Sequence, residues 1–183
     1  MQCELIRGRD LEVAEGVLGG LRHLRRGRGH GDDLSCREDR PVELDRARRY
    51  DQVVTVALFD VDDFKRINDS WGHQVGDKVL QQLVTILRRE LRTMDLLARY
   101  GGEEFVILLP ETGGTGARLF TDRILRRVAQ HNFGSETAPI SVTISAGLAT
   151  FPDDRAADDE ALLKLADENL YKAKRAGRNR YRD

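Results

Sequence analysis

Two adjacent glycines, Gly101 and Gly102, lie between two short apolar segments and constrain the fold of this chain more than any other feature. The flanking segments, Leu96–Tyr100 and Phe105–Leu109, have the length and residue types of β-strands. Because glycine tolerates positive φ, a Gly-Gly pair between two such segments favours a tight turn. The sequence therefore predicts a β-hairpin with two glutamates at its turn.

The spacing of apolar residues on either side of the hairpin predicts further strands and helices. Alternation of period two or continuous apolar runs indicate strands, and recurrence at three or four residues indicates helices. We expect strands over residues 53–60 and 140–148, and helices over residues 76–93, 117–128 and 162–173. Helices interspersed with strands and a hairpin predict an α/β fold of the α+β type, a central mixed sheet surrounded by helices.

The first 44 residues have a different character from the rest. Residues 10–25 carry apolar side chains at helical spacing, and residues 25–33 are rich in glycine and charge with no apolar period. We interpret residues 1–44 as an N-terminal helix and linker, and residues 45–183 as the main domain.

Length, charge and cysteine content exclude several classes of protein. A chain of 183 residues is long enough for one well-buried domain. The apolar runs are far below the roughly 18 residues of a membrane span, and the N-terminus lacks the pattern of a secretory signal. Cys3 and Cys36 have no CxxC partner, which is typical of reduced thiols. The 30 basic and 31 acidic side chains exclude the basic field of a general nucleic-acid binder. We expect a cytoplasmic protein without membrane or nucleic-acid contacts.

Acidic residues follow the first predicted strand and occupy the hairpin turn. Asp60 ends the strand, and Glu103 and Glu104 follow the two glycines. Taken singly, acids at such places are often helix caps or turn residues. If the hairpin lies beside the first strand, however, the carboxylates converge and repel one another unless a cation lies between them. Hard oxygen ligands suit Mg²⁺ or Mn²⁺, and both bind phosphate, so a polyphosphate substrate is expected.

A dense polar run over residues 62–77 carries groups that could read a nucleotide. Asn68 and Asp77 have the donors and acceptors needed at a purine edge, although singly they are typical of a turn and of a helix start. Lys65, Lys174 and Arg178 could neutralise phosphate oxygens, although each alone is an ordinary surface base.

Three segments in order resemble the successive signatures of the GGDEF diguanylate cyclases. They are FDVDDFKRINDSWGHQVGD at 59–77, RYGGEEF at 99–105 and ADENLYKAKRAGRN at 166–179, and the resemblance covers roughly residues 45–180. The third motif position is Glu103 where the name-giving motif has Asp, a common and chemically equivalent variant. The resemblance implies a palm-like nucleotidyl-cyclase fold and an enzyme that condenses two GTP molecules into cyclic di-GMP and pyrophosphate.

The resemblance also implies a role for each matching residue. Glu103 would be the candidate base for the ribose 3′-hydroxyl, with Glu104 beside it in the catalytic set. Two Mg²⁺ or Mn²⁺ ions per half-site would be held by Asp60, the Val61 carbonyl, Glu103 and Glu104. Substrate would be bound by Asn68, His73, Asp77, Lys65, Lys174, Arg178, Gly101 and Gly102.

The resemblance further implies a homodimer and a regulatory site. Family members hold one GTP per subunit, so catalysis requires two half-sites facing each other across a two-fold axis. Arg92 and Asp95 stand at the family's position for the Arg-x-x-Asp site, where cyclic di-GMP would bind and inhibit. Without the family position, these two residues are typical of a helix end and a turn.

Two departures and two rival functions stay open at this point. The family's N-terminal Leu-Thr-Gly-Leu segment has only a distant match at residues 18–26, followed by a Gly/Arg-rich insertion. Residues 113–116 resemble a phosphate loop but lack its lysine, so they are interpreted as a loop before a helix. The first rival is an inactive module that senses cyclic di-GMP through Arg92 and Asp95. The second is a dimerisation or scaffold protein in which the N-terminal helix is the functional part.

Overall fold

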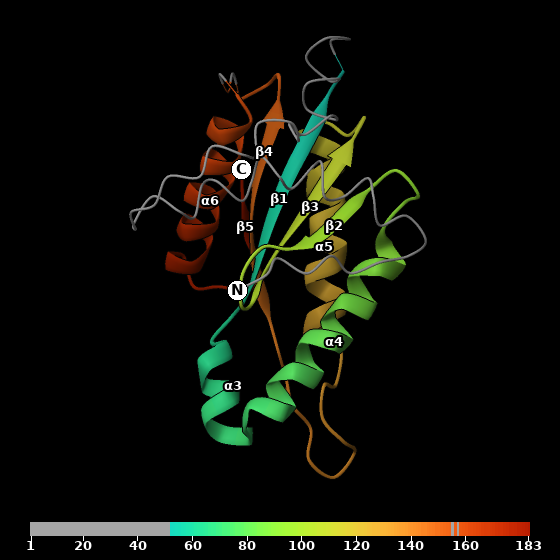
Figure 1. The fold of residues 1–183 in the computed structure, drawn as a ribbon, viewed down its shortest axis with the longest axis vertical. Coiled ribbons are helices and arrows are strands. Elements are labelled where there is room, and N and C mark those ends of the chain that lie inside the picture. Colours follow the sequence, from blue (N-terminus) through green and yellow to red (C-terminus); the bar gives the residue numbers. More distant parts are fainter. Residues whose placement is uncertain (1–51, 155, 157) are drawn as a thin grey trace, which may run out of the picture.

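A single mixed sheet forms the centre of the molecule (Figure 1). The computed structural model describes residues 52–154, 156 and 158–183, and in this part of the chain the strand order is β2-β3-β1-β4-β5. The strands are β1 (Val54–Val61), β2 (Leu96–Arg99), β3 (Glu104–Pro110), β4 (Ile144–Phe151) and β5 (Tyr181–Arg182). The central strand β1 is antiparallel to both β3 and β4, whereas β5 is parallel to β4. The predicted α+β fold with a mixed sheet is therefore confirmed.

Helices cover both faces of the sheet. They are α3 (Phe64–Trp71), α4 (His73–Glu90), α5 (Gly114–Gln130) and α6 (Asp159–Arg175). Successive side chains of a strand point to opposite faces, so Ala57 and Phe59 of β1 pack with α4 and α5, whereas Val56 and Leu58 pack with α6. Burial from both sides explains why all eight residues of β1 are buried.

Helix α6 lies unusually close to β4. A Cβ atom added to Gly147 would be 1.9 Å from the Ala166 carbonyl oxygen and 2.2 Å from the Leu170 nitrogen. Only glycine therefore permits this approach, because the colliding atoms belong to the backbone of α6. The position of α6 on the sheet is fixed by this contact, and with it the position of the basic residues at its C-terminal end.

The predicted hairpin is confirmed, with β2 antiparallel to β3 and Arg99 opposite Phe105. The expectation of a loop over residues 113–116 was wrong in its bounds, because α5 begins at Gly114 and only Gly113 precedes the helix. The helix expected over residues 76–93 begins earlier, at His73, and ends earlier, at Glu90. The strand expected over residues 140–148 was wrong in its bounds, because regular pairing with β1 begins only at Ile144 and continues to Phe151.

Two elements were not predicted from the sequence. Helix α3 has apolar side chains at helical spacing, Phe64, Ile67 and Trp71, but it spans only eight residues and lies within the polar run over residues 62–77. Strand β5 contains only two residues. The expected helix over residues 10–25, the linker, the boundary at residue 44 and both cysteines lie outside the described residues.

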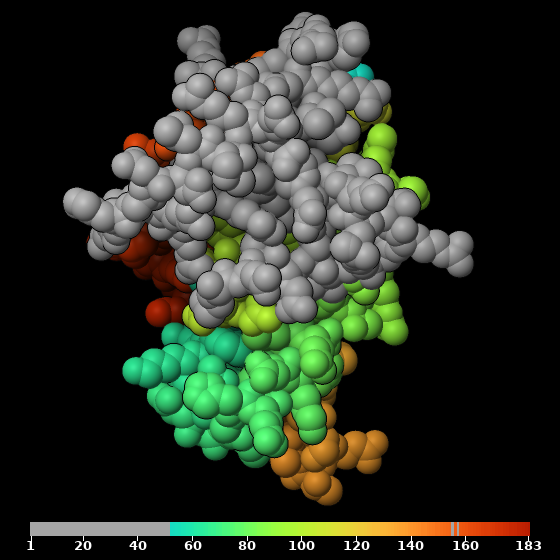
Figure 2. Space-filling view, in the orientation of Figure 1, coloured from blue at the N-terminus to red at the C-terminus, as the bar shows by residue number. Residues whose placement is uncertain are grey.

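Helices α3 and the first turns of α4 lie together beyond one end of the sheet (Figures 1 and 2). Gly72 joins them with a φ of 84°, a conformation that glycine adopts without strain. Figure 2 shows these two segments forming the lower end of the molecule in that view, next to the loop that precedes β4. We call α3 and residues 72–77 the α3–α4 arm. Among the described helices, none has both the length and the apolar character of a membrane span.

Candidate metal and nucleotide site

Asp60 is buried near the end of β1, on the face of the sheet that α6 covers. It follows Leu58 by two residues, so its side chain lies on the same face and is only 5% exposed. The Lys174 Nζ of α6 lies 2.7 Å from its Oδ2. Burial raises the pKa of Asp60, as does the charge of Asp62, whereas the hydrogen bond and charge of Lys174 lower it.

The Gly-Gly turn places Glu103 beside this carboxylate, as predicted. Asp60 is opposite Glu104 in the β1–β3 register, and the Val61 N–H donates to the Glu103 carbonyl oxygen over 3.3 Å. Burial raises the pKa of Glu103, and the negative charges of Asp60 and Glu104 raise it further, against an opposing effect of Lys174. The two carboxylates therefore share one electrostatic environment with an excess of negative charge.

Arg99 fixes the turn that carries the glutamates. Its Nε donates to the carbonyl oxygens of Gly101 and Gly102, each over 3.2 Å, and its second guanidinium nitrogen donates to the Gly102 oxygen over 2.6 Å. The N–H groups of Tyr100 and Gly101 donate to the Glu104 carbonyl oxygen. Sequence reasoning gave Arg99 no role, although an arginine directly before a Gly-Gly turn is well placed to satisfy the turn's carbonyls.

The donor groups at this end of the sheet fit a divalent cation that is shared with phosphate. In the part of the chain that the structure describes, no three acidic, histidine or cysteine side chains form a complete cation site. Mg²⁺ in nucleotide enzymes, however, takes one or two carboxylates and completes its shell with water and phosphate oxygens. Asp60 and Glu103 supply that number of carboxylates.

The residues expected at the guanine lie on the α3–α4 arm. Asn68 is partly buried, and its Oδ1 has no hydrogen-bond partner among the described residues. A Cβ on Gly76 would lie 1.9 Å from that oxygen, so glycine at this position allows Asn68 to reach the start of α4, next to Asp77. Asp77, His73 and Lys65 are all exposed.

Asp62 and Asp63 have different environments from Asp60. Asp63 is exposed, adopts a left-handed φ of 52° and pairs with Arg178, whose Nε lies 3.3 Å from its Oδ1. Asp62 is buried; its Oδ1 accepts a hydrogen bond from Ser145 of β4, and its Oδ2 accepts from Thr143 just before β4 and from Asn179 after α6. The four residues 60–63 thus contain three carboxylates, each with a different set of partners.

The Arg92–Asp95 turn lies at the other end of the hairpin from Glu103. The Arg92 N–H donates to Asp95 Oδ2 over 2.7 Å, and the Asp95 N–H donates to the Arg92 carbonyl oxygen over 3.1 Å. Burial raises the pKa of Asp95, and its Oδ1 has no partner among the described residues. The Arg92 side chain is exposed.

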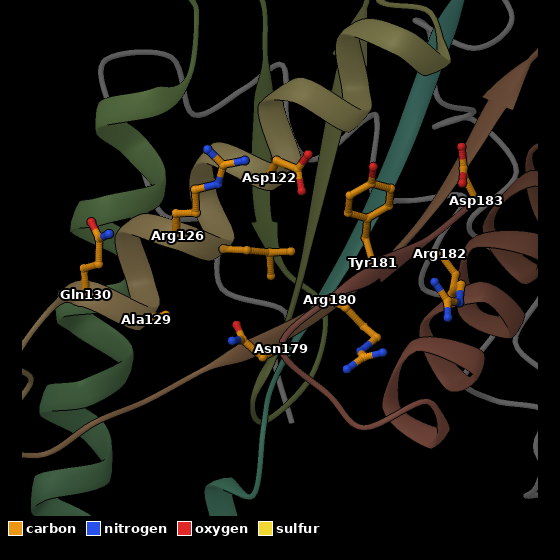
Figure 3. Close-up of a pocket in the computed structure, with 10 residues that line it drawn as sticks. Asp122, Arg126, Ala129, Gln130, Asn179, Arg180, Tyr181, Arg182 and Asp183 are labelled. Carbon is orange, nitrogen blue, oxygen red and sulfur yellow. The ribbon is translucent and has the colours of Figure 1, made fainter.

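A cavity on the described part of the molecule has no predicted site residue in its lining. It has a volume of about 550 Å³ and lies between α5 and β5 (Figure 3). Its walls include Asp122 and Arg126 of α5 and Tyr181 and Arg182 of β5. The carboxylates of Asp60 and Glu103 are not part of its lining.

The sequence matches a family model described as "Diguanylate cyclase, GGDEF domain" over residues 39–180. The chain therefore belongs to the GGDEF family of diguanylate cyclases.

Individual relatives agree with this assignment. The chain is 44% identical to the diguanylate cyclase DgcP of Pseudomonas aeruginosa over 138 residues, which is 75% of this chain and 20% of that protein. It resembles the active GGEEF domain of a diguanylate cyclase from Vibrio cholerae with a TM-score of 0.70 and 34% identity, covering 76% of this chain and 89% of that one. It also resembles the GGDEF domain of DgcB from Caulobacter crescentus, solved with c-di-GMP, with a TM-score of 0.70 and 31% identity over 75% of this chain and 84% of that one. The chain spans about a fifth to a third of the length of the curated relatives it matches.

Proposed function

We propose that the chain is an active diguanylate cyclase that converts two GTP molecules into cyclic di-GMP and two pyrophosphates. The observation that carries the proposal is the approach of Asp60 and Glu103 at one end of β1, where burial raises the pKa of both carboxyls and the charge of Asp60 raises that of Glu103 further. Raised pKa values of paired carboxyls are typical of functional sites. Membership of the GGDEF family and the intact acidic residues support the same activity.

The proposed reaction joins the two nucleotides in two equivalent steps. The 3′-oxygen of one GTP attacks the α-phosphorus of the other, the bond between α-phosphorus and bridging oxygen breaks, and pyrophosphate leaves. Glu103 accepts the proton of the 3′-hydroxyl, for which a raised pKa suits a base at neutral pH. The second step repeats these changes in the other direction and closes the ring.

Asp60, the Val61 carbonyl, Glu103 and Glu104 hold two Mg²⁺ or Mn²⁺ ions in this proposal. When bound, such ions stabilise charge on the attacking oxygen and on the phosphate oxygens. Lys65, Lys174 and Arg178 bind the triphosphate, while Asn68, His73 and Asp77 bind guanine and ribose. Gly101 and Gly102 leave room for the phosphates, since a Cβ on Gly102 would meet nothing within 4 Å.

Two copies of the chain act together in this proposal. One domain binds one GTP, so the attacking hydroxyl and the α-phosphate come from different subunits related by a two-fold axis. Cyclic di-GMP inhibits by binding Arg92 and Asp95, where an exposed guanidinium and a carboxylate oxygen without a partner suit a guanine and a phosphate.

The test is incubation of the purified chain with GTP and Mg²⁺ or Mn²⁺, followed by chromatography for the cyclic dinucleotide. We expect product from the wild type and a loss of at least about a thousandfold in rate for Glu103→Ala, the scale of an essential catalytic group. Unchanged GTP together with tight binding of cyclic di-GMP would instead support the inactive sensor. A chain that binds neither nucleotide would support a scaffold.

A further inference from the structure

Asp62 connects three parts of the chain that are far apart in the sequence. Its Oδ1 accepts from the Ser145 hydroxyl over 2.7 Å, and its Oδ2 accepts from the Thr143 hydroxyl over 2.7 Å and from the Asn179 backbone N–H over 3.0 Å. Its own N–H donates to the Thr143 carbonyl oxygen over 2.9 Å. The side chain is 7% exposed. Asp62 therefore joins the end of β1 to the start of β4 and to the turn after α6.

The turn after α6 has a backbone conformation that needs support. Gly177, Arg178 and Asn179 have φ values of 111°, 60° and 47° in succession. For a residue other than glycine, this left-handed region costs roughly 1–2 kcal/mol. The N–H groups of Gly177 and Arg178 bond back to carbonyls of α6, whereas the N–H of Asn179 bonds to Asp62. Figure 3 shows Asn179 where the segment from α6 leads into β5.

This turn determines where two cations lie. Arg178 directly precedes the bonded Asn179 and pairs with Asp63, and Lys174 lies one helical turn earlier and pairs with Asp60. Asp62 lies between these two carboxylates in the sequence. One buried carboxylate thus anchors the segment whose basic side chains face the acids on either side of it.

We propose that Asp62 is a positioning residue for triphosphate binding: it holds the turn after α6 so that Lys174 and Arg178 face the acidic end of β1. This inference rests on the proposed function, because it uses the triphosphate as the ligand of these two cations. Asp62 touches neither metal nor nucleotide in this role, since its two oxygens already accept hydrogen bonds from the protein. Its effect reaches the ligand through Asn179 and Arg178.

Asp62→Ala and Asp62→Asn test the proposal, with Asp154→Asn as a matched control. Asp154, like Asp62, accepts a hydrogen bond from a backbone N–H, but from that of Thr150 near the far end of β4. Binding of a non-hydrolysable GTP analogue and of GMP to the full chain is measured by calorimetry with Mg²⁺ present. The binding is measured at a temperature at which circular dichroism shows each variant to be fully folded.

We expect Asp62→Ala to weaken binding of the GTP analogue about tenfold, equivalent to ~1.4 kcal/mol, and to keep the affinity for GMP within about twofold of the wild-type value. Asp62→Asn keeps one acceptor oxygen, so its affinity for the GTP analogue should lie between those of Asp62→Ala and the wild type. Asp154→Asn should bind both ligands like the wild type. Equal weakening for both ligands, or unchanged affinity for both, would overturn the positioning role.

The cyclase assay on the wild type separates this inference from the proposed function. If the wild type forms cyclic di-GMP and Asp62→Ala binds the GTP analogue normally, only the positioning role fails. If the wild type binds the GTP analogue in the expected pattern but forms no product, only the proposed activity fails.

Discussion

The two ends of β1 contrast in their polar chemistry. At one end, which we call the Thr55 end, the Thr55 hydroxyl donates to the Thr112 carbonyl oxygen over 2.7 Å and lies 2.9 Å from the Thr150 hydroxyl. Because Thr55 has a single hydroxyl hydrogen, Thr150 must donate to it. The hydroxyl groups of Thr55, Thr112 and Thr150 are neutral, and each has a hydrogen-bond partner.

At the other end, the Asp60 end, buried carboxylates lie close to one another. Burial raises the pKa of both Asp60 and Glu103; the charge of Asp62 raises that of Asp60 further, and the charge of Asp60 raises that of Glu103 further. Lys174 lowers the pKa of both carboxyls, and Arg178 lowers that of Asp60. A neutral network stabilises the fold, whereas ionised carboxylates with raised pKa values destabilise it at neutral pH. The contrast teaches that one end of the strand serves stability, and that the other retains a destabilising arrangement of the kind found at functional sites.

The largest effect on stability is expected at the Thr55 end. Thr55→Val keeps the shape of the side chain but leaves the Thr112 carbonyl and the Thr150 hydroxyl without their partner, so we expect a loss of about 1–3 kcal/mol in the free energy of unfolding. Urea denaturation followed by circular dichroism measures this change. Thr55→Ser, which keeps the hydroxyl, is the control. If Thr55→Val is as stable as the wild type, the hydrogen bonds at the Thr55 end do not stabilise the fold, and the contrast with the Asp60 end is wrong.

A smaller effect of opposite sign is expected at the Asp60 end. The folded-state pKa of Glu103 is raised, so the protonated form favours folding, and that contribution is lost as the pH rises through the folded pKa. Glu103→Gln removes the ionised carboxylate. It should therefore raise the free energy of unfolding at pH 7 by less than about 1 kcal/mol, because solvent screens a partly exposed group, and the thermal midpoint should rise with it.

The same variant should lose its advantage in acid. As the pH falls toward the ordinary pKa of a glutamate, the wild-type carboxyl becomes neutral like the glutamine, so the two midpoints should converge. Calorimetric scans from pH 7 downward measure this difference. A difference that grows on acidification would mean that Glu103 is stabilised in its ionised form, and the contrast between the two ends would be wrong.

Much of the fold could be predicted from the sequence because burial leaves a local pattern. The hairpin was recognised from two glycines between apolar segments, and α5 and α6 from apolar residues at helical spacing. Helix α3 was not found this way, because its eight residues carry only three apolar side chains, Phe64, Ile67 and Trp71, and only Phe64 is buried. Strand β5 is held by pairing with β4 rather than by a pattern of its own.

The candidate site also has features that could be predicted from the sequence and features that could not. The approach of Asp60 and Glu103 was predicted because both follow local features, a strand end and a turn, which neighbouring strands bring together. The hydrogen bonds of Asp62 were not predicted, because their donors lie 81, 83 and 117 residues further along the chain. Only the folded structure shows that Asp62 accepts hydrogen bonds from the protein, whereas Asp60 forms an ion pair with Lys174.

Protons and metal should compete for the carboxylates at the Asp60 end. Metal binding requires ionised ligands, so protons and the cation compete for Asp60 and Glu103, whose raised pKa values place that competition at higher pH than for ordinary carboxyls. The rate of cyclic di-GMP formation should therefore fall as the pH is lowered, and tenfold more Mg²⁺ should move the midpoint of this fall to lower pH by at most about one unit. Initial rates over a pH series at two Mg²⁺ concentrations measure the shift, with ionic strength held constant by an inert salt because screening alone alters surface charges. A midpoint independent of Mg²⁺ would mean that the titrating group is not a metal ligand, and the carboxylates of this end would then have to act on the substrate alone.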